Sequence, residues 1–419
     1  MKDRKQILFS CLFNAKHLQK LIVIAFYSIA LLLFSNHSLP AQEWHPGDPL
    51  KIKLGKGDSA FSIQPFAVVR VLMTYADKQL YTSDPGTRGG FRFEQQLGSQ
   101  LSVFGHVELS MRLMNTGQKF ALSPDNSTES GSFSNAEITS SNNVFGLRQT
   151  FIGFNLKKYG SISFGKQNSA YKMVGERTDI SEANSGFASY VYSTEGSDGG
   201  LTGTGRANNN VTYKNTFGKR LQFAVSGMFS QNAKSDSSIR TMDAASVSAI
   251  LTVTKGFDLA VAYNHVFIAD AYFKNEIVYG LKNNPNYLLL GAQYKNKHIL
   301  LAVNYAFQKY GDLTNVKTIN SSGNVIYKTV VYSGSGFEGV GQYNYKKWIA
   351  LGGVNLKSPA RDENKLMSGA FNRQHFFYGI QYRTTKSLTI FFEGRIEDSK
   401  DANGIQLPDA NMIGLKFII

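Results

Sequence analysis

Apolar and polar side chains alternate with a period of two along most of the chain after residue 60. In the segment 101–113, every odd position is Leu, Val, Met or Gly, whereas the even positions are Ser, Phe, His, Glu and Arg. Successive side chains of a strand point to opposite faces, so this pattern predicts a β-strand with one apolar face. Similar alternation recurs at 221–230, 299–308 and 388–397. Such lengths exceed the roughly 5–6 residues of a globular strand and suit the roughly 9–11 tilted residues that cross a bilayer.

The connections between these segments alternate between short and long. Short turns are predicted at 98–100, 158–160, 216–220, 255–256, 295–298, 346–347 and 384–387. Long polar segments lie between the hairpins, at 76–87, 114–144, 169–205, 232–243, 268–285, 309–333, 358–373 and 398–409. Seven hairpins, a first strand near 61–75 and a last strand near 410–419 make sixteen strands. The sequence therefore predicts an all-β fold, a 16-stranded antiparallel transmembrane β-barrel over residues 61–419, with short periplasmic turns and long extracellular loops.

The strand number indicates what such a barrel does. About 8 strands leave an interior filled by side chains, whereas 16–18 strands leave an aqueous channel. The simplest function is a water-filled pore for small hydrophilic solutes. A water-soluble β-sandwich is the alternative fold, but its strands would be shorter and its outward face would carry charges. A β-propeller would show a repeat of about 40 residues with blade motifs, and the sequence has none.

The first residues have the pattern of a secretory signal. Five basic residues precede or flank the start of the apolar run Leu21 to Phe34, and the small-residue site Ser38-Leu39-Pro40-Ala41 follows. Because 14 residues are fewer than the roughly 20 that a membrane-spanning helix needs, residues 1–41 are predicted to be a cleaved signal peptide rather than an anchor. Residues 42–60 are then a short periplasmic segment.

The composition and the motifs of the chain argue against several kinds of binding site and catalysis. The 419 residues include one cysteine, Cys11, which the predicted cleavage removes, so a disulfide framework and a cysteine zinc site are excluded. The seven histidines show no metal-ligand spacing and no Gly-x-Ser-x-Gly elbow is present. The spacing Gly334-x-Gly336-x-x-Gly339 lies in an alternating segment with no following helix, which disfavours dinucleotide binding. We therefore expect no enzyme activity, no cofactor, no metal and no nucleic-acid partner.

The charge balance is basic. Lys and Arg number 45 against 30 Asp and Glu, a formal net charge of +15, and removal of residues 1–41 lowers it to +11. An arginine facing lipid at mid-membrane costs about 2–4 kcal/mol, so arginines at membrane depth are expected to face the lumen. The basic excess predicts a mild preference for anions.

Four short motifs resemble those of the general, non-specific trimeric porins of Gram-negative outer membranes. They are Arg88-Gly-Gly-Phe-Arg-Phe-Glu94, Arg148-Gln-Thr-Phe-Ile-Gly-Phe154, Gly160-Ser-Ile-Ser-Phe-Gly-Lys166, and Arg206 with Asn208, Asn209, Val211 and Tyr213. The third and fourth motifs flank the longest polar segment, 169–205. The motifs occur in the same order as in that family, and the resemblance covers most of residues 61–419.

The resemblance implies a site and partners. The third long loop would fold into the channel, with carboxylates that face wall arginines across the narrowest point. The wall positions are Arg88, Arg148 and Arg206, with Arg92 beside them and Arg70 added by strand parity. The acidic partners on the loop are Asp179, Glu182, Glu195 and Asp198. It also implies a homotrimer in the cell outer membrane, in contact with lipid and lipopolysaccharide, that passes small hydrophilic solutes by passive diffusion.

Three other functions remain open at this stage. The first is a substrate-specific channel of similar size for a small anion such as phosphate, in which basic side chains bind the solute. The second is an outer-membrane enzyme such as a lipase, for which the strand pattern offers no Ser–His pair at the rim. The third is an adhesin that uses the long loops, which is compatible with pore activity.

Overall fold

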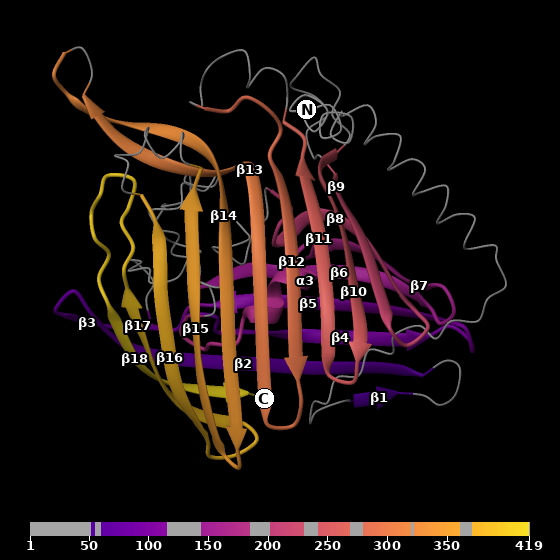
Figure 1. Ribbon diagram of the computed structural model, residues 1–419. Helices are drawn as coiled ribbons and strands as arrows, with labels where there is room; N and C mark the ends of the chain where they lie inside the picture. Colours follow the sequence, from indigo (N-terminus) through magenta and orange to yellow (C-terminus); the bar gives the residue numbers. More distant parts are fainter. Residues whose placement is uncertain are drawn as a thin grey trace.

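The structure is a computed structural model in which an antiparallel sheet rolls up into a closed barrel (Figure 1). It describes residues 52–54, 60–114, 144–184, 202–229, 242–268, 280–319, 322–360 and 371–418. The predicted signal peptide, residues 1–41, lies outside the described residues. Within them, no helix is long and apolar enough to cross a membrane.

Sixteen of the eighteen strands in the sheet form the barrel wall, as the sequence predicts. Each pairs in antiparallel fashion with its neighbour along the chain, and the last strand pairs with β2, for example Lys416 beside Arg70, which closes the barrel. Closure removes the free sheet edge that lipid does not tolerate. The wall strands are β2 (Phe61–Ala76), β4 (Arg88–Gln96), β5 (Leu101–Met111), β6 (Phe145–Leu156), β7 (Gly160–Asn168), β8 (Arg206–Phe217), β9 (Leu221–Phe229), β10 (Met242–Thr254), β11 (Phe257–Val266), β12 (Asn286–Lys295), β13 (Ile299–Ile319), β14 (Val325–Tyr345), β15 (Trp348–Pro359), β16 (Arg373–Arg383), β17 (Leu388–Glu397) and β18 (Ala410–Ile418).

Two further strands lie outside this ring. β1 (Ile52–Leu54) belongs to the predicted periplasmic segment and pairs with the first residues of β2. β3 (Gln79–Ser83) folds back on the far end of β2, so part of the predicted loop 76–87 is a strand.

The two faces of the wall differ as the period-two pattern predicts. On β13, Leu301, Val303, Tyr305 and Phe307 are exposed on the outside, and Leu301 retains 54% of its accessible surface. The side chains between them, among them Asn304 and Gln308, are buried on the inside. An outer face of this kind is stable against hydrocarbon and not against water, which is the arrangement of a transmembrane barrel.

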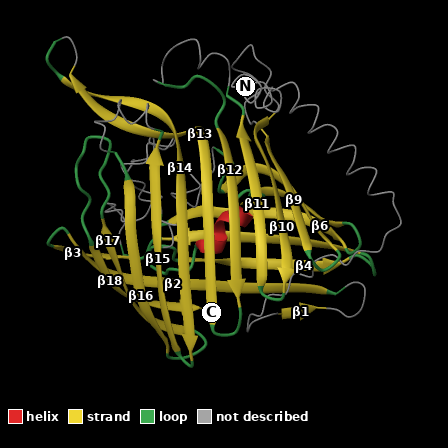
Figure 2. Ribbon diagram, viewed as in Figure 1, coloured by secondary structure: helices red, strands yellow, loops and turns green. Residues whose placement is uncertain are grey.

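Part of the interior is filled by the segment that follows β7. This segment contains a short helix, α3 (Lys172–Gly175), and a 3-10 turn, η4 (Glu176–Thr178), and the helix lies within the ring of strands (Figure 2). Tyr171 and Val174 are fully buried against the inner faces of β10 to β13. The wall is made of small residues there, including Ala244, Ala260, Ala262 and Ala306, which leave room for the helix. The barrel's main hydrophobic cluster is therefore inside the lumen, on one side.

One predicted loop is wrong. Most of the segment 309–333 is not a loop, because β13 and β14 each continue for 21 residues and pair as far as Ile319 with Val325. A register shift between Gln308 and Asp312 bends this hairpin, which extends beyond the other strands (orange in Figure 1). Polar composition alone does not distinguish a loop from a strand pair in water.

The outer face yields a first prediction. Val303→Arg should destabilise the folded barrel by about 2–4 kcal/mol, since Val303 lies on the outer face midway along the wall part of β13 and a guanidinium in hydrocarbon loses its hydration. Gln342→Arg on the paired strand is the control, because Gln342 lies on the inner face three positions from the partner of Val303. Urea titrations of both variants in phospholipid vesicles measure the free energy of unfolding. Equal losses for the two variants would contradict a lipid-facing outer wall.

Candidate constriction in the barrel lumen

The loop after β7 crosses the lumen and is held by carboxylates on the opposite wall. Arg177 forms an ion pair with Asp258 of β11, with 3.3 Å between guanidinium nitrogen and carboxylate oxygen. Next along the loop, the Thr178 hydroxyl donates a hydrogen bond to Glu338 of β14, which is fully buried. Asn304 of β13 donates to the carbonyl of Gly175 at 3.0 Å. The loop therefore follows the inner wall from β7 towards β17.

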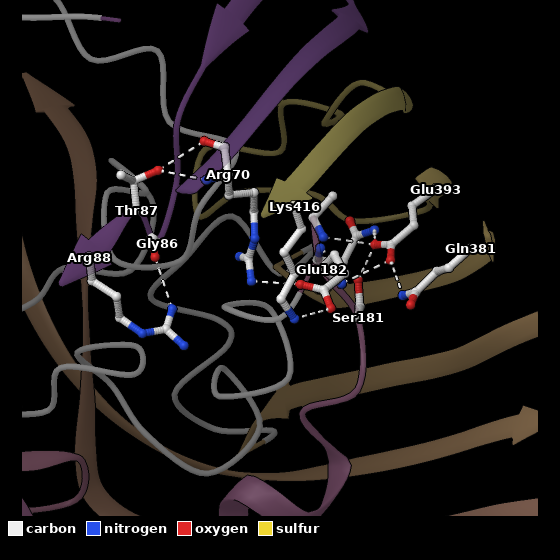
Figure 3. A network of polar contacts seen from close by, with 11 residues as sticks. Arg70, Gly86, Thr87, Arg88, Ser181, Glu182, Gln381, Glu393 and Lys416 are labelled. Carbon is white, nitrogen blue, oxygen red and sulfur yellow. Dashed lines mark hydrogen bonds and ion pairs between the residues drawn. The ribbon is translucent and has the colours of Figure 1, made fainter. Parts of the chain in front are cut away.

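Glu393 of β17 is the strongest of these anchors. Its carboxylate accepts hydrogen bonds from the backbone N–H groups of Glu182 and Ala183, both at 2.8 Å, and from the Ser181 hydroxyl (Figure 3). Gln381 of β16 donates to the same carboxylate at 3.2 Å, and Glu393 is fully buried. Hydrogen bonds to a charged acceptor are stronger than neutral ones, so this carboxylate fixes the turn at residues 181–184.

Within that turn, the Glu182 side chain reaches the place where β18 pairs with β2 and closes the barrel. Its carboxylate forms ion pairs with Arg70 of β2 at 2.7 Å and with Lys416 of β18 at 2.6 Å (Figure 3). Burial alone would raise the pKa of Glu182, but the two cations hold it below its ordinary value. The loop is therefore ionically fastened to the wall at this point.

The arginine wall lies beside this contact. The charges of Arg70, Arg148 and Arg206 all act on Arg88, so these four arginines form one cluster. Glu108 of β5 lies between two of them: its carboxylate is 2.8 Å from Nε of Arg148 and 3.4 Å from Nε of Arg88. The Arg88 guanidinium also donates to the carbonyl of Gly86 at 2.9 Å. The narrowed passage consequently has a basic side.

Some of the predicted site residues lie together in the structure and others do not. The structure brings Arg70, Arg88, Arg148 and Arg206 together, and it places the guanidinium carbon of Arg92 4.7 Å from the ring centroid of Phe66. Glu182 touches the arginine wall directly, whereas we expected it to face that wall across open water. Asp179 is exposed, and its charge interacts with those of Lys172 and Arg70. The other two predicted acidic residues, Glu195 and Asp198, lie outside the described residues.

Several residues of the site escaped the sequence analysis. Glu108, on the polar face of the segment 101–113, was not among the predicted site residues, yet it is buried and paired with two arginines. The three anchoring carboxylates and Lys416 were not identified. A usable signal was present: Glu338 is the one acidic residue of β14, and Glu393 shares the inward face of β17 with Arg395 and Glu397, where a buried charge requires a partner. In the described part of the chain, no group of three or more His, Cys, Asp or Glu side chains could hold a metal ion.

Known proteins resemble this chain in sequence profile and in fold. The profile of a family described as Gram-negative porin matches residues 73–402. No curated protein sequence shows significant similarity. Among solved structures, OmpF of Salmonella typhi in complex with daunomycin superposes with a TM-score of 0.63 at 17% identity, covering 88% of this chain and 100% of that one. The anion-selective porin from Comamonas acidovorans gives 0.57 at 11% identity, covering 86% and 100%. The trimer form of OmpT from Vibrio cholerae gives 0.55 at 11%, covering 86% and 99%.

Proposed function

Since this chain belongs to the Gram-negative porin family and forms an outer-membrane channel, we propose that it conducts small hydrophilic solutes and ions by passive diffusion, with a mild preference for anions. The observation that carries the anion preference is the arginine cluster, Arg70, Arg88, Arg148 and Arg206, on the wall that the inward loop reaches at Glu182. Within the described residues, two carboxylates, Glu108 and Glu182, contact this cluster. The wall thus retains an excess of positive charge where the loop narrows the lumen.

The size of the preference follows from electrostatics. A unit charge about 10 Å from a passing ion contributes about 0.4 kcal/mol in water, and salt at physiological strength reduces this to about 0.1 kcal/mol. An excess of two charges then favours an anion and disfavours a cation by roughly 0.2 kcal/mol each. The expected ratio of chloride to potassium permeability is about 2.

A planar-bilayer experiment tests this proposal. The reversal potential under a KCl gradient should show chloride permeating more readily than potassium, and conductance should rise linearly with KCl concentration. Linear conductance supports diffusion through a general pore. Saturation at millimolar anion concentrations would support the alternative, a substrate-specific channel for a small anion such as phosphate. A cation preference would refute the assignment of the arginine cluster.

The assembly and processing also belong to this proposal. We expect a homotrimer surrounded by outer-membrane lipid and lipopolysaccharide, since one structural relative is described as a trimer. Cross-linking in mild detergent should then give bands up to three chains. Residues 1–41 are expected to be removed during export, leaving residues 42–60 as a periplasmic segment, and mass spectrometry of the outer-membrane protein would show this.

A further inference from the structure

A row of aromatic side chains lines the inner wall on β2, β5 and β6. The rings of Phe66 and His106 are nearly parallel, with centroids 5.5 Å apart and planes inclined by 21°. His106 and Phe151 continue the row at 5.4 Å and 19°. Phe104 meets Phe151 edge-on, with centroids 6.4 Å apart. We call Phe66, Phe104, His106 and Phe151 the lumenal aromatic row.

The strand register explains how the row forms. His106 and Phe151 are direct cross-strand partners on β5 and β6. Phe66 pairs with Gly90 on β4, and the missing side chain at Gly90 lets the Phe66 ring reach across β4 towards β5. Gly153 has the same effect beneath Phe104, because a Cβ there would lie 2.6 Å from the tip of the Phe104 ring. The row is therefore built into the wall.

The row lies beside the arginine cluster, closer to the short turns. His106 precedes Glu108 by one inward position on β5, and their facing side-chain atoms are 3.9 Å apart. Glu108 in turn contacts Arg88 and Arg148. On the other side, the Arg92 guanidinium lies over the Phe66 ring at 4.7 Å. A cation, Arg92, thus borders the aromatic surface on one side, and on the other side the Glu108 carboxylate separates the row from Arg88 and Arg148.

Exposed apolar rings are unusual in a lumen that passes water. Phe66, Phe104 and Phe151 are each half-buried, so part of each ring remains accessible. Apolar surface in water is unfavourable, and a solute that covers it gains free energy. Aromatic rings pair with other rings and with guanidinium groups, and arginine also pairs with carboxylates. A solute with a flat apolar body and an anionic group meets both requirements.

From this arrangement we infer that the lumenal aromatic row and Arg92 form a weak binding station for aromatic carboxylates. The ring of the solute would pack on Phe66 and Phe151, and its carboxylate would lie at Arg92. The inference rests on the proposed diffusion function and names a class of solute that the channel retains longer than others. Slower passage of such solutes would appear as a block of the ionic current.

The test uses the full-length protein in planar bilayers with three probes added to KCl: benzoate, acetate and benzylammonium. Benzoate should halve the chloride current at a concentration about fivefold lower than acetate, given the strength of aromatic pairing. Benzylammonium, which has the ring and the opposite charge, should block less than benzoate. Equal block by benzoate and acetate, or stronger block by benzylammonium, would overturn the inference without any variant.

Variants distinguish the contribution of the aromatic rings to benzoate block from the contribution of the Arg92 charge. Phe66→Ala combined with Phe151→Ala should raise the half-blocking concentration of benzoate about fivefold and leave that of acetate unchanged. Arg92→Gln should weaken benzoate block while all four rings remain. Phe154→Ala is the matched control, since Phe154 is exposed on the outer face of β6, and it should change neither value. If both inner-wall variants conduct KCl and keep the wild-type response to benzoate, the row is only structural. A protein that forms no KCl-conducting channel would instead contradict the proposed function.

Discussion

Replacing Glu393 by Ala is expected to release the turn at residues 181–184 from the barrel wall. The variant removes the acceptor for the N–H groups of Glu182 and Ala183 and for the Ser181 hydroxyl. Hydrogen bonds to a charged group contribute about 1.5–3 kcal/mol each, and lumen water replaces part of that loss. A net cost of about 2–4 kcal/mol to loop docking lowers the ratio of docked to undocked loop by about 30- to 700-fold.

Single-channel recording measures this release. The wild-type channel should show one steady open level, whereas Glu393→Ala should show rapid transitions between levels and a higher mean conductance, because the loop leaves the passage. Glu393→Gln should give an intermediate result, since the amide oxygen still accepts hydrogen bonds but lacks the charge. The barrel itself should remain folded, as its strands keep their own pairing.

Glu94→Gln is the control for Glu393. Glu94 lies on β4, where its carboxylate accepts a hydrogen bond from Gln96 of the same strand, and it does not touch the described part of the loop, so its recordings should match the wild type. A Glu393→Ala channel with unchanged noise and unchanged conductance would show that the other contacts of the loop, among them the ion pairs of Glu182 with Arg70 and Lys416, hold it without Glu393.

The second large effect concerns selectivity. Replacing Arg88, Arg148 and Arg206 together by Gln should lower the ratio of chloride to potassium permeability by about threefold. The three charges contribute roughly 0.4 kcal/mol after screening, with opposite signs for the two ions. Glu108 strengthens the change, because it loses both of its guanidinium partners. The reversal potential under a KCl gradient should shift towards the cation side.

A second triple variant tests whether the effect on selectivity depends on where the charges lie or only on the net charge of the protein. Lys158, Lys255 and Lys295 are exposed in or beside the short turns, and replacing all three by Gln removes the same charge outside the lumen. This control should leave the reversal potential nearly unchanged at physiological salt, since the Debye length is only about 8 Å. Equal shifts in the two triple variants would mean that overall charge, rather than the arginine cluster, determines the ion preference.

The accuracy of the sequence prediction varied along the chain for identifiable reasons. The strand alternation around Leu101 predicted β5 well, because lipid selects against polar side chains on every outward position. The hairpin that ends at Ile319 and Val325 was assigned to a loop, because Lys, Asn, Thr and Gly residues interrupt the period-two pattern between residues 309 and 333. The inward position of Asn304 was predicted correctly, but its partner Gly175 was not, because nothing in local periodicity shows which wall a loop meets.

The sequence by itself determined the sixteen wall strands and therefore the barrel. These features follow from periodicity and from the high cost of polar side chains in hydrocarbon, which act on each position separately. The inward third loop and most of the arginine wall were implied by the resemblance of short motifs to a family, not by periodicity. Only the tertiary structure decided that Glu182 touches Arg70 and Lys416, that Glu393 holds the loop, and that Glu108 lies between two arginines. Those contacts join residues up to 234 positions apart, and closure of the barrel, which no local pattern encodes, sets which of them meet.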